Sequence, residues 1–196
     1  PAAAAVVADP LYADQWHLKN TGQLGGTIGE DVDVEPVWAT HKGTGVSIAV
    51  VDDGLEIAHE DLASNVAATG QSYNYLNGGS DPTGGEHGTA VGGVVAARDS
   101  NGIGGTGAAP RAGLVGYNLL QSLNSLNEAD AMTRNGVSVF VSNNSWGAPD
   151  GTGHYDASAA TWRAAINTGL SAGRNGRGII YTWAAGNGGA GNVDNS

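Results

Sequence analysis

The stretch Val46-Ser47-Ile48-Ala49-Val50-Val51-Asp52-Asp53-Gly54 decides the fold, because an apolar run ends here in two acids and a glycine. A short run of Val, Ile and Ala is typical of a strand that is buried on both faces of a parallel sheet. In such sheets helices cover both faces. We therefore expect a strand over Val46–Val51 and a turn at Asp52-Asp53-Gly54.

The same pattern continues along the chain. The expected strands are Val46–Val51, Leu114–Leu120, Val137–Val141 and Ile179–Trp183. The expected helices are Thr89–Ala97, Asn127–Asn135 and Ala157–Leu170. This alternation predicts an α/β fold with a doubly wound, mainly parallel sheet, helices on both faces and right-handed crossovers.

Composition limits the classes of partner. The 196 residues, 40% of them hydrophobic, are enough for one core, so we expect a single domain. Nineteen acidic residues against eight Lys and Arg give a net charge of -11. This charge disfavours nucleic acid and favours basic ligands or metal cations. Without Cys there is no disulfide and no thiol nucleophile, and no apolar run is long enough to span a membrane.

The amino-terminal residues favour a processed product. The chain opens with Pro1, and its only methionine is Met132. Residues 1–8 are expected to form an arm, with the end of a signal or pro-segment as the alternative. They lack the basic region and the long apolar stretch of a complete signal peptide.

Polar signatures come where the expected strands end. Asp52-Asp53 follows the first strand, residues 142–147 follow the third, and residues 184–188 follow the fourth. The carboxyl ends of parallel strands face one crevice, where ligands bind. His87 precedes a helix of small residues, which can aim its imidazole into the same crevice. The sequence therefore predicts one site that these segments share.

Asp52, His87 and Asn187 form a set suited to acyl transfer. A buried Asp bonded to one imidazole nitrogen fixes the tautomer and leaves the other nitrogen free to take a proton from a nucleophile. Asn187, beyond a glycine turn, can donate to the oxyanion of a tetrahedral intermediate. An Asp-Gly pair after a strand is by itself more often a turn, so the prediction depends on the joint pattern.

Four segments in this order, Val-Asp52-Asp53-Gly, His87-Gly-Thr, Ser-Trp146-Gly and Gly-Asn187-Gly-Gly, resemble the subtilisin-like serine proteases, particularly the kexin and furin branch of the proprotein convertases. The similarity runs from about Asp9 to the last residue. It implies the amino-terminal part of a subtilisin-like catalytic domain over residues 1–196, from a calcium-dependent serine endopeptidase that is secreted, extracellular or periplasmic. Val91 replaces a Cys found in many eukaryotic convertases, which suggests a bacterial relative.

The resemblance implies a serine nucleophile in a Gly-Thr-Ser segment, and the 196 residues contain none. Ser145 precedes Trp146-Gly147 and matches the substrate-binding strand of the family, not its nucleophile. We therefore expect the serine on a carboxyl-terminal segment, a sheet that is incomplete at that end, and a chain that is inactive alone. That segment and a pro-segment or chaperone-like inhibitor are the implied protein partners.

The resemblance also implies an acidic substrate cleft. A second acid at position 53 is typical of kexin-like members, and Asp150 matches the acid at the base of their primary pocket. Carboxylates bind Lys and Arg by charge-assisted hydrogen bonds, so the implied substrate is a peptide or protein with basic residues before the scissile bond. The expected substrate-binding residues are Asp53, Glu128, Trp146, Gly147, Asp150 and Gly186.

Two departures from the family pattern limit this selectivity, namely Gly84 and a loop after Asp150 that is one residue shorter than in the family. Gly84 stands where convertases carry another acid, three residues before the histidine, which argues against strict dibasic selectivity. Glu128 matches the distal acidic site of the family. It also falls in the first turn of an expected helix, where an acid serves the helix dipole equally well.

Calcium is the cofactor that the resemblance implies. Hard cations take carboxylate, amide and carbonyl oxygens. The expected ligands of one ion are the side chains of Asp9, Asp61 and Asn101 and the carbonyls of Arg98, Ile103 and Gly105. A second ion is expected between Asp150 and Asp194. Asn101-Gly102 can also be simply a turn.

Two other function classes match parts of the sequence. The chain could be a non-catalytic module that binds basic peptides in an acidic cleft, but binding requires none of Asp52, His87 and Asn187. It could be a nucleotide-binding protein, because residues 102–107 formally match the dinucleotide fingerprint. That segment follows an expected helix and precedes a strand, which is the reverse of the required context.

Overall fold

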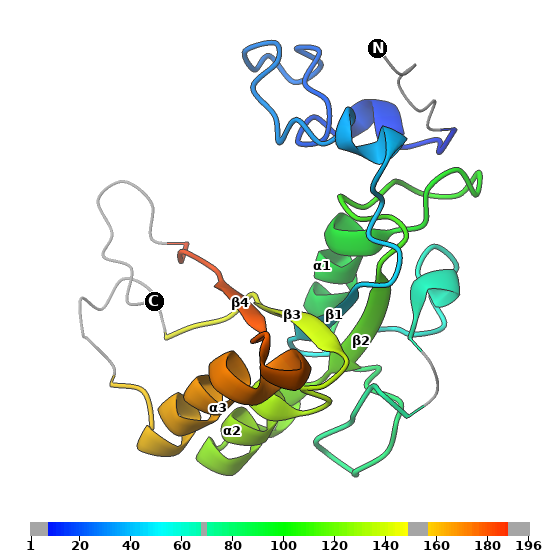
Figure 1. Cartoon of the computed structure of the whole chain (residues 1–196). Coiled ribbons are helices and arrows are strands. Elements are labelled where there is room, and N and C mark those ends of the chain that lie inside the picture. The colour runs from blue at the N-terminus through cyan, green and yellow to red at the C-terminus, as the bar shows by residue number, and fades with distance from the viewer. Residues whose placement is uncertain (1–7, 68–69, 149–156, 188–196) are drawn as a thin grey trace.

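A parallel sheet with helices on both faces forms the body of the molecule (Figure 1). The computed structural model describes residues 8–67, 70–148 and 157–187. Within these ranges the sheet has four strands in the order β2-β1-β3-β4, and every pairing is parallel. The strands are β1 (Ser47–Val51), β2 (Gly113–Tyr117), β3 (Val139–Asn144) and β4 (Ile180–Trp183).

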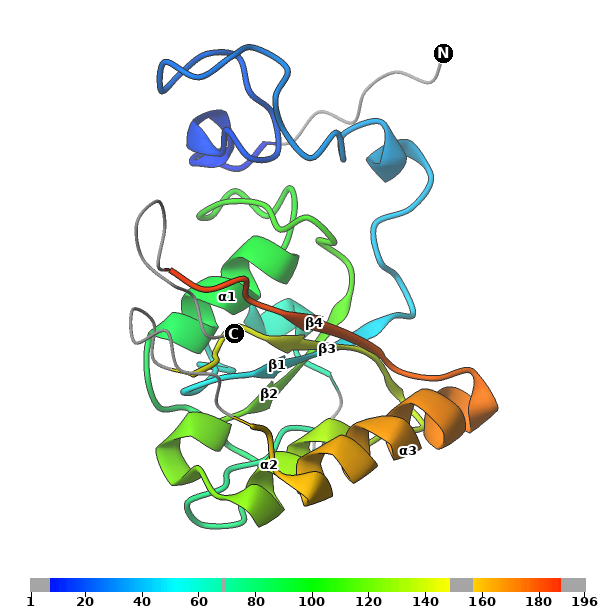
Figure 2. The ribbon, with the colours of Figure 1, turned by 90° about the vertical axis from the view of Figure 1, so that its left-hand side faces the viewer.

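The helices divide between the faces of the sheet. They are α1 (His87–Ala96), α2 (Ser125–Thr133) and α3 (Ala160–Gly176). Figure 2 shows α1 on one side of the strands and α2 with α3 on the other. Short 3-10 turns lie at Tyr12–Asp14, Val37–Ala39, Ala63–Asn65 and Leu119–Ser122. The predicted α/β fold with a parallel sheet covered on both faces is confirmed.

The strand residues pack alternately into the two halves of the core. Ile48 and Val50 of β1 pack on the α1 side with Leu114, whereas Ala49 and Val51 pack on the α2 side. Val50 and Val51 are completely buried. Burying such a side chain contributes about 1.5–3 kcal/mol, so β1 is anchored through both faces at the point where the polar turn begins.

The boundaries of β2, β3 and α3 differ most from the prediction. β2 ends at Tyr117, because the chain turns at Asn118, whose Oδ1 accepts a bond from the backbone N–H of Tyr75. β3 continues to Asn144, whose buried side chain donates to the Thr182 carbonyl of β4. The polar residues 142–144 thus lie within β3 and not after it. α3 begins at Ala160 and extends to Gly176.

The extension of α3 includes an irregular turn. Arg174 and Asn175 have left-handed backbone conformations, with φ of 51° and 57°. The backbone N–H of Arg174 bonds the Gly136 carbonyl, and its guanidinium lies over the Phe140 ring, 4.2 Å from the centroid. These contacts hold the turn against β3. Among the described residues, no helix has the length and apolar character needed to cross a bilayer.

Candidate functional site

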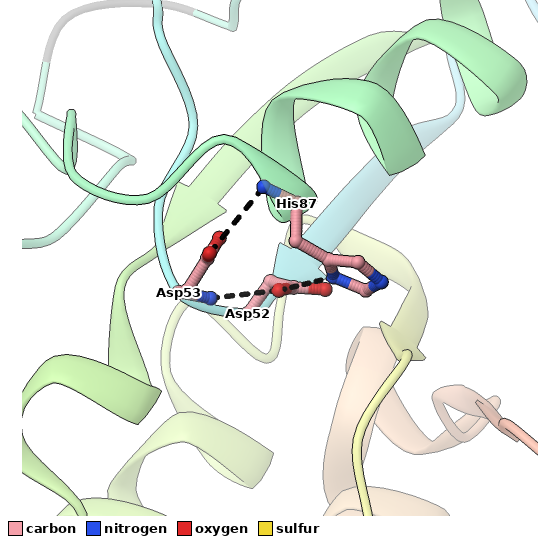
Figure 3. A group of neighbouring side chains, drawn as sticks. All are labelled: Asp52, Asp53 and His87. Atoms are coloured by element: carbon pink, nitrogen blue, oxygen red, sulfur yellow. Dashed lines mark hydrogen bonds and ion pairs between the residues drawn. The ribbon is translucent and has the colours of Figure 1, made fainter. Parts of the chain in front are cut away.

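The side chains of Asp52 and His87 form a hydrogen-bonded pair at the carboxyl end of β1. Asp52 follows β1 directly, and His87 is the first residue of α1. Oδ1 of Asp52 lies 2.8 Å from Nδ1 of His87 (Figure 3). Because a carboxylate can only accept, Nδ1 carries the proton, and in the neutral ring Nε2 keeps a lone pair. The structure therefore brings together the acid and the base that the sequence predicted.

The backbone around Asp52 fixes the acid in place. Its N–H donates to the Tyr117 carbonyl, and its own carbonyl accepts from the N–H of Leu120. Asp52 is completely buried, whereas the His87 side chain is 58% exposed. The imidazole is thus held from the buried side and accessible from the other.

Burial and hydrogen bonding shift the pKa of both groups. Burial raises the pKa of the Asp52 carboxyl, while the bonds from His87 and from the Asp53 N–H oppose that rise. The bond to Asp52 raises the pKa of His87 above its ordinary value of 6.5, against a smaller opposing effect of burial. The raised pKa makes the exposed imidazole a stronger proton acceptor, which suits a general base.

Asp53 is bonded to the start of α1. Its Oδ1 accepts from the backbone N–H of Gly88 at 2.8 Å, and its Oδ2 accepts from the N–H of His87 at 3.3 Å. Its own N–H donates to Oδ1 of Asp52 at 2.8 Å. Sequence reasoning missed this role, because no local pattern links residue 53 to residues 87 and 88. Contact of Asp53 with a substrate stays a prediction.

The other predicted residues of the site follow β3 and β4 or begin α2. Trp146 is partly buried against the core, and Gly147 after it is exposed. Gly186, with φ of 93°, and the exposed Asn187 follow β4, and the Ala184 N–H ties this segment to the Asn144 carbonyl at 3.0 Å. Parallel strands place these residues at the same edge of the sheet as Asp52.

Glu128 comes from a helix, and two further predicted acids lie outside the described residues. Glu128 lies in the first turn of α2 and is partly exposed. Asn124 caps that helix by accepting from the backbone N–H groups of Leu126 and Asn127. Asp150 and Asp194 lie outside the described residues, so the base of the primary pocket and the second calcium site stay predictions.

A pocket of about 450 Å³ lies beside α1. Its lining includes Glu56, Asp61 and Glu86, together with His59 and the Gly84-Gly85 backbone. Neither Asp52 nor His87 lines it. The pocket therefore adjoins the acid–base pair, through Glu86, without containing it.

The predicted calcium ligands gather around one loop. Asp9 accepts from the N–H groups of Ser100, Asn101 and Gly102 and from the Thr106 hydroxyl at 2.5 Å. Asp61 accepts from the Asn101 side chain at 2.8 Å and from the Gly105 N–H at 3.1 Å. The Arg98 N–H bonds the Asp61 carbonyl, and the Ile103 N–H bonds Oδ1 of Asn101. Sequence reasoning missed Thr106, which is 97 residues from Asp9.

This cluster fits a calcium ion. Asp9 and Asp61 are each only 5% exposed, and within the described part of the chain no Lys or Arg pairs with either. A Cβ added at Gly104 would meet the Asp61 carboxylate, so the loop lies directly on that acid. Two buried carboxylates and an amide are among the oxygen donors that calcium prefers.

A second group of potential ligand atoms consists of the acid–base pair together with Asp53. The ligand atoms of Asp52, Asp53 and His87 lie within 4.8 Å of one another. Their hydrogen bonds are already made among themselves and to α1. The carboxylates of Asp9 and Asp61 also accept hydrogen bonds, so hydrogen bonding does not separate the two groups, and the loop around Asp9 and Asp61 is the one that the sequence predicted to bind calcium.

Comparisons with known proteins agree with this geometry. The family model Peptidase_S8, described as the subtilase family, matches residues 43–196. Neuroendocrine convertase 2 of Bos taurus is 34% identical over 194 residues, which is 94% of this chain and 30% of that protein. The chain thus spans under a third of the length of such curated relatives.

Solved structures of serine proteases are also similar to this chain. The crystal structure of a serine protease of Aeromonas sobria is similar with a TM-score of 0.79 and 37% identity, over 93% of this chain and 33% of that one. The Aeromonas sobria serine protease in complex with the chaperone ORF2 gives a TM-score of 0.77 and 36% identity, over 93% of this chain and 32% of that one.

Proposed function

This chain belongs to the subtilase family, and we propose that it provides the acid, the base and the oxyanion donor of a calcium-dependent serine endopeptidase that cleaves after basic residues. The observation that carries the proposal is the 2.8 Å bond between Asp52 and Nδ1 of His87. That bond fixes the histidine tautomer and leaves Nε2 to accept a proton. A module that only binds peptides would need neither feature.

In the proposed mechanism, Nε2 of His87 takes the proton of a serine hydroxyl as the oxygen attacks the peptide carbonyl. The buried carboxylate of Asp52 stabilises the imidazolium that forms. Asn187 donates to the oxyanion of the tetrahedral intermediate. His87 then returns the proton to the leaving amine. Since the 196 residues contain no Gly-Thr-Ser segment, we place the serine on a further, carboxyl-terminal segment of the same protease.

The proposed substrate is a peptide or protein with Lys or Arg before the scissile bond. The net charge of -11 supports attraction of basic chains. Asp53, Glu128 and Asp150 are the proposed carboxylates of the cleft, and the backbone at Trp146, Gly147 and Gly186 would hold the substrate main chain. The convertases among the relatives support this assignment.

Calcium would be held by Asp9, Asp61 and Asn101, with the carbonyls of Arg98, Ile103 and Gly105. Its positive charge would neutralise two buried carboxylates. Asp9 already fastens the amino-terminal segment to the loop at residues 98–106 through hydrogen bonds. The ion would strengthen that connection, which lies apart from the acid–base pair.

We propose a pro-segment or chaperone-like protein as a further partner and secretion as the localisation. The first is supported by the Aeromonas sobria protease, which has been crystallised with the chaperone ORF2. The second is supported by similarity to proteases such as neuroendocrine convertase 2.

The test is turnover of fluorogenic peptides by the full-length protein. Peptides ending in Arg or Lys before the reporter are expected to be cleaved, and matched peptides with Ala or Glu there are expected to be poor substrates. Cleavage should disappear with a serine-directed phosphonate. Tight binding of the basic peptides with no turnover would instead identify a non-catalytic module.

A further inference from the structure

We propose that Asp53 is a positioning residue, which fastens the start of α1 to the end of β1 and so sets His87 against Asp52. The effect of Asp53 on catalysis rests on the proposed function. Its attachment of α1 to β1 is a property of the fold and does not depend on that function. This role differs from contact with a basic substrate side chain, which the family resemblance implies for the same residue.

The first argument is that α1 needs an acceptor at its amino end. The first N–H groups of any helix have no partner within the helix. Glu86 occupies the cap position of α1, yet its side chain makes no capping bond. The Asp53 carboxylate instead accepts from the consecutive N–H groups of His87 and Gly88, at 3.3 and 2.8 Å. The cap of α1 therefore comes from another element of the chain.

The second argument is that Asp53 contacts both members of the pair. Its backbone N–H donates to Oδ1 of Asp52, the same oxygen that accepts from Nδ1 of His87. Figure 3 shows the resulting arrangement, in which the Asp53 carboxylate reaches the backbone nitrogen of His87 while its N–H reaches Asp52. A displacement of α1 would thus disturb the bonds of Asp53 and the Asp52–His87 bond together.

The third argument is that polar contacts carry the attachment at this end of α1. Gly88 approaches the chain so closely that an added Cβ would meet the Gly54 carbonyl and lie 2.7 Å from Cβ of Asp52. Gly85 likewise leaves room for the Asp53 carboxylate, which an added Cβ would meet. Glycines contribute no side-chain packing here. The negative charge of Asp53 at a helix amino terminus is also favourable.

These contacts predict how strongly two substitutions of Asp53 loosen the start of α1. Asp53→Asn keeps the shape and one acceptor but loses the charge and one acceptor oxygen. Asp53→Ala loses both. Loss of a hydrogen bond to a charged group corresponds to about tenfold or more in a local opening equilibrium. Hydrogen exchange of the Gly88 amide should therefore accelerate about tenfold or more in Asp53→Ala and by less in Asp53→Asn.

The experiment measures residue-resolved hydrogen exchange in the full-length protein, with circular dichroism as the check on folding. Glu86→Gln is the control, because the Glu86 side chain is charged but makes no capping bond. Exchange of the Gly88 amide should be unchanged in this variant. In parallel, kcat and KM are measured on peptides with a small neutral residue where Asp53 would otherwise meet a basic one. Asp53→Ala should lower kcat at least tenfold on these peptides with little change in KM.

A role confined to substrate binding gives the opposite pattern. Exchange at Gly88 would then be normal in Asp53→Ala, and KM would rise only for peptides with Lys or Arg at that position. Either result overturns the proposal. If the full-length protein cleaves no peptide, the proposed function fails, but the exchange measurement still decides whether Asp53 fastens α1.

Discussion

Nδ1 of His87 lies 2.8 Å from Oδ1 of Asp52, although 35 residues separate them in the chain. The acid is completely buried at the end of a central strand, and the imidazole is more than half exposed at the start of a helix. The pair therefore joins a rigid interior anchor to an accessible base.

Asp52→Asn separates catalysis from stability. On the proposed function, we expect kcat of the full-length protein to fall about 10⁴-fold, because in the amide variant Nδ1 can no longer donate to a carboxylate. The folded pKa of Asp52 lies above its unfolded value. The ionised group therefore opposes folding at neutral pH. The free energy of unfolding at pH 7, from urea titration, should be unchanged or higher, and a large drop would contradict the role of burial.

The pH dependence of turnover should report His87. The base must be neutral, so kcat/KM should rise with pH through a pKa above 6.5. In Asp52→Asn the residual activity should show a lower midpoint, because the bond that raises the histidine pKa is weakened. An acid limb below pH 6.5 in the unmodified enzyme would contradict this prediction.

His87 also contributes to stability with a defined sign. Its folded pKa is raised above the unfolded value of 6.5. The contribution is therefore fully present below pH 6.5 and is lost as the pH rises through the folded pKa. Thermal melts of His87→Gln should lack this decline above pH 6.5. The His59→Gln variant, with His87 intact, should keep it.

Removal of calcium should destabilise the protein. At an ion concentration of 100 times the Kd, binding stabilises the fold by about 2.7 kcal/mol, which a chelator removes. Asp61→Asn should abolish the response to calcium in thermal melts, because it replaces a buried carboxylate ligand. The exposed neighbour Glu60 provides the matched control, since Glu60→Gln should keep the full response. A melting temperature that changes with neither calcium nor chelator would rule out the site.

Two glycines of α1 test the packing of the helix that carries His87. An added methyl group at Gly88 would meet the Gly54 carbonyl, whereas nothing lies within 4 Å of one at Gly93. Gly88→Ala should lower the free energy of unfolding by about 1–3 kcal/mol through overpacking. Gly93→Ala should raise it by about 0.5–1 kcal/mol, because alanine favours the helix. Denaturant titration of both variants checks the difference, and equal effects would contradict the close approach.

Sequence reasoning predicted the architecture because burial leaves a local pattern. Unbroken runs such as Val46–Val51 mark strands covered on both faces, and the alternation with helices implies parallel pairing. The order of the polar segments also placed Asp52 and His87 at one edge of the sheet. The rule that ligands bind at the carboxyl ends of parallel strands made this possible.

The amino-acid sequence by itself thus determined the sheet, its covering helices and the meeting of Asp52 with His87. Only the tertiary structure decided that Asp53 bonds to α1, that β3 includes Asn144, and that Thr106 holds Asp9. Each of these depends on hydrogen bonds between residues far apart in the chain. Such bonds are set by the position and direction of individual donors and acceptors, which leave no periodic trace in the sequence, whereas hydrophobic burial does.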